Sequence, residues 1–405
     1  MKNILIIGAG VEACEGIKIA KNMGLGLIIA DGNPQAPGFA WADHRIVAST
    51  YDGKAIADQA ITLKASGVTI DGVIAMCADV PMSVAIVANA LHLPGLTLES
   101  AHWVADKLAM KDQLKAQNIP IPAYCAVPAK ADVYQCAENI GLPLVIKPVD
   151  SRGARGVQYI DHLASLESAW ELAAQESPTG RVMMEEYLPG PQFSTETLAD
   201  NGHYYTLGFA DRNYEWLEKT KPFMIENGGD SPTAQSAEVK QKVIDVAEQA
   251  AKALGIDSGV AKGDMVFSGG QAKVIEIAGR LSGGYFSTTQ IPLATGVNFI
   301  EKAIKLALGE HLSVQEVTPK HHKGVAIRYL DLAPGRIHTI ENQEQAQALA
   351  GVEMLSLFIQ PGDYIAPLAN HTQRAGFVIS CADTKADAIA IANNALAQLN
   401  ISYEV

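Results

Sequence analysis

The chain has 405 residues, of which 48% are hydrophobic and 19% charged, and its formal net charge is −13. This length favours two or three domains with large cores, and the apolar content excludes an intrinsically disordered chain. Nucleic acids and anionic membranes require a basic surface, so the acidic balance favours small-molecule partners, with no nucleic-acid and no membrane partner.

The cysteine pattern is typical of reduced thiols. The five cysteines are odd in number, widely spaced and contain no C-x-x-C pair. Such usage indicates a reducing compartment and shows no zinc ribbon or redox motif. The first apolar run spans residues 4–7 only, which is too short for a signal peptide or a membrane span. We therefore expect a cytoplasmic protein with free cysteines.

Residues 1–100 alternate short apolar segments with helical patterns. Strands are predicted at residues 4–7, 27–30 and 73–76, and helices begin near Glu12, Lys54 and Met82. Such alternation predicts a parallel sheet wrapped by helices. A further helical pattern runs from Ala101 through residues 106–111, and the prolines after Asn118 stop it at a predicted domain junction.

Two more regions follow, and together they predict a fold of class α/β and α+β. Residues 101–320 are expected to form the second domain, with a mobile lid subdomain at about 118–188 and a closing helix at 297–308. Residues 321–405 are expected to form a small C-terminal α+β domain. Its predicted elements are strands near 326–330 and 377–381 and a helix at 385–399.

The glycine-rich start permits an alternative function. Residues 8–13 (GAGVEA) follow a strand and open a helix, and Asp31 ends the next strand where a ribose-binding acid would lie. This is the pattern of an NAD(P)-dependent oxidoreductase. It is weak by itself, because its third position is Ala13 and any tight strand-to-helix turn favours glycine. We rank the oxidoreductase second.

A lysine and a glycine loop form the strongest segment. Lys147 stands at the end of the apolar run 144–148 and is followed by the glycine-containing residues 150–157. One cation at a cleft edge, with glycine N–H groups closing over phosphate oxygens, suits a nucleotide. About thirty residues later, the apolar run 182–188 ends in Glu185 and Glu186, where a strand end can contact adenine.

Two acids are brought together by a predicted hairpin at residues 263–280. If Asp264 pairs with Glu276, the loop has three residues, 269–271, and both carboxylates project from one face. Lys262 and Arg280 then share that face. Two hard oxygen ligands beside two cations suit magnesium and a triphosphate. An even loop without a bulge would instead turn the acids to opposite faces.

These segments, in this order, resemble the ATP-grasp superfamily over residues 1–320, within the branch of amino-acid ligases, carbamoyl-phosphate synthases and phosphoribosylglycinamide synthetases. The resemblance implies a pre-ATP-grasp domain at 1–100, an ATP-grasp domain at 101–320 and a closing domain at 321–405. It assigns phosphate binding to a first set of residues: Lys107, Lys147, Ser151, Arg152, Gly153 and Gly156. It assigns the adenine hinge and the ribose contact to a second set: Glu185, Glu186, Tyr187, Leu188 and Gln192.

The resemblance also implies metal and catalytic residues. Asp264 and Glu276 are the expected magnesium ligands, and Arg280 is expected to contact the γ-phosphate or an acyl phosphate, with Lys262 beside it. Many members have glutamate where Gln192 stands and asparagine where Ala278 stands. Glutamine still hydrogen-bonds a ribose hydroxyl, but alanine leaves a second ion to Glu276, phosphate and water.

The substrate residues are less well defined. Gly283 and Gly284 permit close approach because they lack Cβ, and Arg374 is expected either to clamp a carboxylate or to lie on the surface. Residues 218–232 either line the site or form a solvated connector.

The resulting hypothesis is an ADP-forming ligase that activates a carboxylate as an acyl phosphate and joins it to an amine. ATP and one or two Mg²⁺ ions are implied, with Mn²⁺ as an alternative, and the hypothesis leaves open whether the chain acts as a homodimer. A biotin-carboxylase-like enzyme is a further alternative, disfavoured because no biotin-carrier Met-Lys-Met segment is present.

Overall fold

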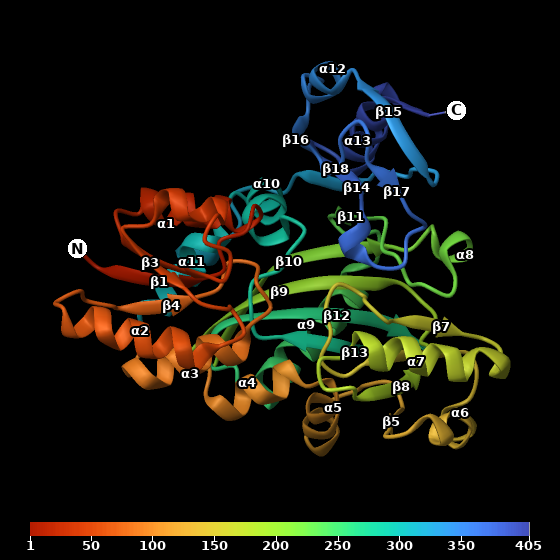
Figure 1. Ribbon diagram of the computed structural model, residues 1–405, viewed down its shortest axis with the longest axis horizontal. Coiled ribbons are helices and arrows are strands. Elements are labelled where there is room, and N and C mark those ends of the chain that lie inside the picture. Colours follow the sequence, from red (N-terminus) through yellow and green to blue (C-terminus); the bar gives the residue numbers. More distant parts are fainter. Residues whose placement is uncertain (405) are drawn as a thin grey trace.

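The computed structural model describes residues 1–404, and its strands form four sheets that Figure 1 shows in sequence colours. The N-terminal sheet is parallel, with the order β3-β2-β1-β4. Its strands are β1 (Asn3–Ile7), β2 (Gly26–Asp31), β3 (His44–Val47) and β4 (Gly72–Ile74). Its helices are α1 (Ala13–Asn22), α2 (Gly53–Ala65) and α3 (Pro81–Leu91). The predicted parallel sheet with helical connections is confirmed.

The helical pattern after residue 98 is interrupted at one residue. Asp106 has extended backbone angles (φ −116°, ψ 110°) between α4 (Leu98–Ala105) and α5 (Lys107–Ala116). Its carboxylate accepts hydrogen bonds from the backbone N–H groups of Leu108 and Ala109. The expected continuous helix is therefore wrong here, because aspartate caps a new helix more readily than it continues an old one.

A small antiparallel sheet with the order β5-β8-β6-β7 follows in the chain. Its strands are β5 (Tyr124–Val127), β6 (Leu144–Pro148), β7 (Gln158–Ile160) and β8 (Val182–Glu186), and its helices are α6 (Val133–Ile140) and α7 (Leu166–Glu176). Cys125 of β5 and Cys136 of α6 form a disulfide, with Cα atoms 5.9 Å apart. The expectation of five free cysteines is wrong for this pair, because residues eleven apart meet where a strand turns into the neighbouring helix.

The largest sheet has eight antiparallel strands in the order β13-β12-β9-β10-β11-β14-β18-β16. The strands before residue 320 are β9 (Gln192–Asp200), β10 (His203–Asn213), β11 (Gly228–Ser231), β12 (Ser258–Ser268) and β13 (Gln271–Ala278). The strands after it are β14 (Gly324–Tyr329), β16 (Val352–Leu357) and β18 (Gly376–Ala382). The associated helices are α8 (Leu217–Thr220), α9 (Ala237–Ala253), α10 (Ile291–Thr295) and α11 (Phe299–Ala307).

The C-terminal residues thus continue the large sheet and add a small one. The order of that small sheet is β17-β15-β19, with β15 (Gly335–Glu341), β17 (Tyr364–Ile365) and β19 (Asn400–Tyr403). Helices α12 (Gln343–Gln347) and α13 (Lys385–Gln398) complete this unit, which stands above strands β9, β12 and β13 in Figure 1.

The N-terminal sheet packs on the large sheet through a shared apolar core. This core joins Ile4 and Ile6 of β1 to Leu198 of β9 and to Phe299 of α11, all nearly inaccessible to solvent. The packing fixes the turn after β1 against the large sheet. No helix within residues 1–404 has the length and apolarity of a membrane span.

Candidate active site

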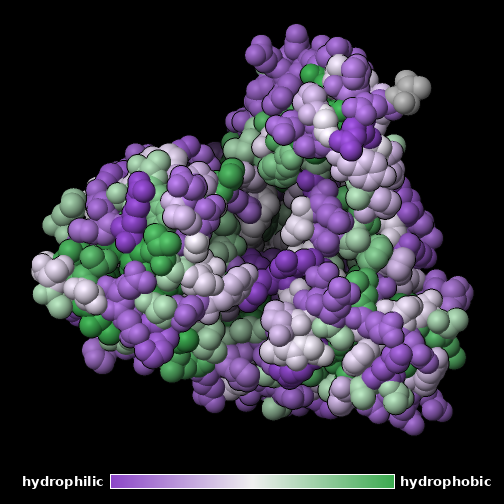
Figure 2. Space-filling model, viewed as in Figure 1, coloured by the Kyte–Doolittle hydropathy of each residue, from purple (hydrophilic) through white to green (hydrophobic). Residues whose placement is uncertain are grey.

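A cavity of about 620 Å³ lies between the N-terminal sheet, the small antiparallel sheet, the large sheet and the C-terminal unit. Figure 2 shows a hollow at the centre of the face of the molecule that is turned toward the viewer. Every residue assigned from the sequence lines the cavity except Gly156, which packs against Pro148 and α7 with φ at +71°. The residues it brings together are Lys107, Lys147, Ser151, Arg152, Gly153, Glu185, Glu186, Tyr187, Leu188, Gln192, Lys262, Asp264, Glu276, Arg280, Gly283, Gly284 and Arg374.

A buried ion triad lies under one end of the cavity. Glu185 Oε1 is 2.5 Å from Lys147 Nζ, and Glu185 Oε2 is 3.2 Å from Lys111 Nζ. Burial raises the pKa of Glu185, but the two lysines outweigh it and hold that pKa below its usual range. Burial lowers the pKa of Lys111 to about 8. The Glu185 carboxylate therefore holds two lysines in place, and its contact with adenine stays a prediction.

The acidic hairpin pairs as expected, but by a different loop. Ser268 pairs with Gln271 across the two-residue turn Gly269–Gly270, whose φ angles of +59° and +80° favour glycine. A register shift after Val274 then restores the direct pairing of Asp264 with Glu276. The three-residue loop is thus wrong and the pairing is confirmed. A β-bulge supplies the extra residue that keeps both acids on one face.

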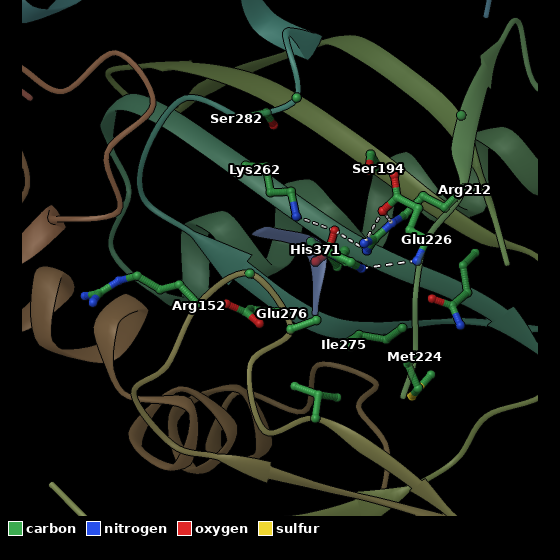
Figure 3. A pocket seen from close by; sticks show the side chains of 18 of the residues that line it. Arg152, Ser194, Arg212, Met224, Glu226, Lys262, Ile275, Glu276, Ser282 and His371 are labelled. Carbon is green, nitrogen blue, oxygen red and sulfur yellow. Dashed lines mark hydrogen bonds and ion pairs between the residues drawn. The ribbon is translucent and has the colours of Figure 1, made fainter. Parts of the chain in front are cut away.

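Cations from three elements lie near the two acids, and Figure 3 labels two of these cations, Lys262 and Arg212, together with Glu276. Lys107 Nζ lies 3.5 Å from Glu276 Oε1 and donates to the Ser151 carbonyl at 3.0 Å. Asp264 forms ion pairs with Lys262 and with Arg212, the latter at 2.5 Å. Although burial raises the pKa of Asp264, these two cations lower it well below the usual range.

The donor set fits a magnesium ion shared with phosphate. Within residues 1–404 no group of three or more potential ligands gathers, and the paired Asp264 and Glu276 would be the protein's share of the ligands. Mg²⁺ commonly takes one or two carboxylates and completes its shell with phosphate oxygens and water. Ala278 lies opposite Lys262 and adds no ligand.

Arg280 turns away from the hairpin toward the N-terminal sheet. Its NH2 nitrogen is 3.1 Å from Asp79 Oδ2, and Arg152 Nε is 3.6 Å from the same oxygen. Asp79 therefore brings together one arginine after β13 and one from the loop after β6. The buried Nε of Arg280 has no hydrogen-bond partner in the described chain. No sequence pattern indicated Asp79, because its contacts depend on packing between distant segments.

The substrate residues of the C-terminal unit also face the cavity. The guanidinium of Arg374 stacks on Tyr329 at 3.8 Å from the ring centroid and donates to the Glu226 carbonyl at 2.5 Å. Its buried Nε has no hydrogen-bond partner within residues 1–404. Arg374 thus lines the cavity and is not a surface arginine. Nearby, burial lowers the pKa of His371 to about 3, so the neutral ring accepts from the Glu226 N–H.

Residues 218–232 contribute to the cavity and do not form a solvated connector throughout. Glu226 and Met224 line it, and Glu226 Oε2 is 2.6 Å from the NH2 nitrogen of Arg212 (Figure 3). Arg212 was missed from the sequence, and Glu226 was named there only as part of the segment 218–232. The charged end of the long strand β10 was the available signal for Arg212.

The glycine-rich turn does not hold a free ribose-binding acid. Asp31 Oδ2 accepts from the Ala9 N–H at 2.7 Å, and Oδ1 accepts from the Asn33 N–H at 2.8 Å. Both carboxylate oxygens thus tie local backbone together, and the oxidoreductase alternative has no support from this residue.

Two known families match the chain. Residues 104–284 match the ATP-grasp domain, and residues 328–404 match the L-amino acid ligase C-terminal domain 2. The first match contains Lys107 and Lys147, the small antiparallel sheet, and the hairpin that carries Asp264 and Glu276. The second contains Arg374 and Phe377.

The individual relatives share only about a quarter of their residues with this chain. The chain is 26% identical to uncharacterized protein y4rH of Sinorhizobium fredii over 77% of this chain and 64% of that protein. It is 25% identical to the L-arginine-specific L-amino acid ligase of Bacillus subtilis over 67% of this chain and 66% of that one. The matches thus span slightly less than two thirds of these relatives. The crystal structure of an L-amino acid ligase from Bacillus licheniformis has the same fold, with a TM-score of 0.85, 22% identity and coverage of 100% and 99% of the two chains.

Proposed function

Residues 104–284 match the ATP-grasp domain, and from that premise we propose that the chain is an ADP-forming ligase of the ATP-grasp type. It would use ATP with Mg²⁺ or Mn²⁺ to activate a small-molecule carboxylate as an acyl phosphate. An amine would then attack the acyl carbon to form an amide. The proposed substrates are a carboxylate and an amine of amino-acid size, the class that the name of the Bacillus subtilis relative indicates.

One observation carries the proposal: the cavity gathers the cations and the acid pair that a nucleotide triphosphate needs, and leaves space beyond them. Lys107 and Lys147 supply positive charge at one end, while Asp264 and Glu276 share one face of the hairpin. Phosphoryl transfer asks mainly for positioning and for neutralisation of charge.

The residues divide the reaction between them. Lys107 and Lys147 would bind phosphate oxygens, and Asp264 and Glu276 would hold the metal ion, which when bound offsets part of the charge of the triphosphate. The substrate carboxylate attacks the γ-phosphorus, and ADP leaves. Arg280, whose Nε lacks a partner among the described residues, faces the acyl phosphate. When the amine attacks, the C–N bond forms and the C–O bond to phosphate breaks. The attacking ammonium group gives up one proton to solvent before it attacks and a second to the leaving phosphate, and the amide keeps the third as its N–H.

The small antiparallel sheet is proposed as the lid, at about residues 118–188. Gly153 of its phosphate loop accepts a hydrogen bond from the His371 N–H of the C-terminal unit at 2.9 Å. Tyr159 N–H donates to the Pro222 carbonyl at 2.7 Å. These contacts support a lid that closes against both the C-terminal residues 321–405 and the segment before β11, which excludes water from an acyl phosphate.

The testing experiment is a screen for ADP release with ATP, Mg²⁺ and pools of carboxylates and amines. We expect ADP release that requires both a carboxylate and an amine. A stabilisation of the protein by NAD(H) or NADP(H), with none by ATP and Mg²⁺, would replace this proposal with the oxidoreductase.

A further inference from the structure

The acids that line the cavity differ in their partners. Eight acids line it, and seven of them have a lysine or arginine nitrogen within 4.0 Å. The seven pairs are Asp79 with Arg280, Glu185 with Lys147, Glu186 with Lys273, Asp211 with Lys385, Glu226 with Arg212, Asp264 with Lys262, and Glu276 with Lys107. The eighth, Glu12, has no such cation within residues 1–404.

Glu12 is nevertheless held firmly at the cavity wall. It ends the glycine-rich turn, and its Oε1 accepts from the Tyr285 N–H at 3.1 Å. A Cβ on Gly283 would lie 3.3 Å from Oε1 and 3.5 Å from Oε2, so glycine there permits the approach. The turn that resembles a dinucleotide motif thus presents a carboxylate to the loop that follows Arg280.

No cation of the described protein balances the negative charge of the Glu12 carboxylate. Burial raises the pKa of Glu12, although hydrogen bonds from Tyr285 and Gly284 and the charge of Arg280 act in the opposite direction. Arg280 is already paired with Asp79. Glu12 is half-buried, and a carboxylate partly withdrawn from water is normally paired, so the missing cation is expected from a ligand.

The surroundings indicate what kind of cation this is. The cavity wall beside Glu12 is aromatic: Tyr285 packs on Phe377 with ring centroids 4.9 Å apart, and Tyr329 lies 6.4 Å from Phe377. All three line the cavity. Aromatic faces suit a cation that carries an apolar group, and a metal ion would instead require more oxygen ligands.

We propose that Glu12 binds the primary ammonium group of the substrate, with the apolar part of that substrate against Tyr285, Tyr329 and Phe377. The ammonium belongs either to the acid that is activated or to the amine that attacks. The assignment of the ammonium group to one of the two reactants rests on the proposed function. The proposal that Glu12 binds an ammonium group does not depend on it.

Glu12→Gln tests the charge with little change in shape, because the amide oxygen still accepts from the Tyr285 N–H. The matched control is Glu15→Gln, which lies one turn of backbone away and is ion-paired with Lys18 at 2.7 Å. The binding probe is L-phenylalaninamide, which carries an ammonium and an aromatic group but no carboxylate. Its partner probe, 3-phenylpropanamide, lacks the ammonium.

Binding is measured by calorimetry on the full chain with Mg²⁺ and a non-hydrolysable ATP analogue. We expect Glu12→Gln to weaken L-phenylalaninamide binding about tenfold or more, the range for hydrogen bonds to charged groups. Glu15→Gln should bind it as the wild type does, and 3-phenylpropanamide should not distinguish the three proteins. Equal affinity in wild type and Glu12→Gln, or no binding to the wild type, overturns the proposal.

A second assay identifies the source of the ammonium. Hydroxylamine traps an acyl phosphate as a hydroxamate without any other amine. If Glu12→Gln raises the Michaelis constant for amino acids in this assay but not for acids without an amino group, Glu12 binds the activated acid. If the variant impairs amide formation alone, Glu12 binds the attacking amine. An unchanged profile in both assays contradicts the proposal. Absence of any acid-dependent ADP release by the wild type refutes the ligase function instead, and the calorimetry still decides the role of Glu12.

Discussion

The end of the cavity that we propose binds the nucleotide and the end that we propose binds the other substrates are built differently. At the nucleotide end, the ionic groups already pair with one another: Lys147 with Glu185, and Asp264 with Lys262 and Arg212. At the substrate end, Glu12 has no cation and Arg374 has an unpaired Nε, both within residues 1–404. The nucleotide end is thus organised mainly by ion pairs within the protein, with the Nε of Arg280 left without a partner, whereas the substrate end leaves its charges for the substrate to complete.

The two ends differ in when the desolvation cost of their charged groups is offset. Each buried charge at the nucleotide end has offset much of its desolvation cost within the folded protein, so these groups are held in place before ATP binds. At the substrate end, binding itself supplies the missing partners. Changes at the first end should therefore abolish the chemistry, and changes at the second end should alter substrate affinity.

The largest effect is expected for Glu276→Gln. Loss of one of two carboxylates that face the metal should lower turnover about a hundredfold or more, because the ion contributes several kcal/mol of charge stabilisation. The measurement is ADP release as a function of Mg²⁺ concentration, and the variant should also require more Mg²⁺. Chelation of the metal by EDTA should stop the wild-type reaction, and Mg²⁺ or Mn²⁺ should restore it. A wild-type Mg²⁺ profile for Glu276→Gln would remove this residue from the metal site.

Lys147→Ala should come next, with a loss of turnover of about a hundredfold, since one preorganised phosphate donor is removed. Glu185 keeps Lys111 as its partner in this variant, so the fold should survive. Measurement of ATP binding tests the loss of the phosphate contact, and circular dichroism tests whether the fold survives. Lys242→Ala, which breaks an exposed ion pair with Glu238 on α9, is the control for general effects. Wild-type ATP affinity and turnover in Lys147→Ala would contradict its assignment.

Arg374→Ala should act at the other end of the cavity. The Michaelis constant for the substrate that bears a carboxylate should rise about tenfold, while ATP affinity stays unchanged, which is the signature of lost substrate binding. Arg374→Lys should recover only part of the loss, because lysine lacks the planar fork. An equal loss of ATP affinity would show that Arg374 belongs to the nucleotide end and would break the comparison.

The smallest effect is expected for Gln192→Glu. A carboxylate accepts stronger hydrogen bonds from ribose hydroxyls than an amide does, so the Michaelis constant for ATP should fall about two- to fivefold. The constants for both other substrates should stay the same, as steady-state kinetics can show. A weaker interaction with ATP in this variant would place Gln192 away from the ribose.

Much of the nucleotide end could be predicted from the sequence because its residues follow strand ends in chain order. Lys147 ends β6, and Asp264 and Glu276 sit on one hairpin whose pairing follows from strand alternation. The loop length could not be predicted, because a two-residue turn with a bulge and a three-residue turn give the same pairing near the acids.

The contacts missed from the sequence come from packing between segments far apart in the chain. Asp79 meets Arg280 across 201 positions, and the Glu226 N–H meets His371 across 145. The local periodicity of a sequence does not predict contacts between residues so far apart. The Cys125–Cys136 disulfide was missed for a related reason, since spacing alone does not tell how a strand and the next helix turn toward each other.

The central claim is that the carboxylate attacks the γ-phosphate, and transfer of an oxygen label tests it most directly. The acid identified by the ADP-release screen is labelled with ¹⁸O in its carboxylate, and the products are examined by ³¹P NMR after one round of amide formation with the wild-type protein. An acyl phosphate intermediate predicts one ¹⁸O atom in the inorganic phosphate and none in the nucleotide. Unlabelled phosphate, or ¹⁸O in AMP, would contradict the account.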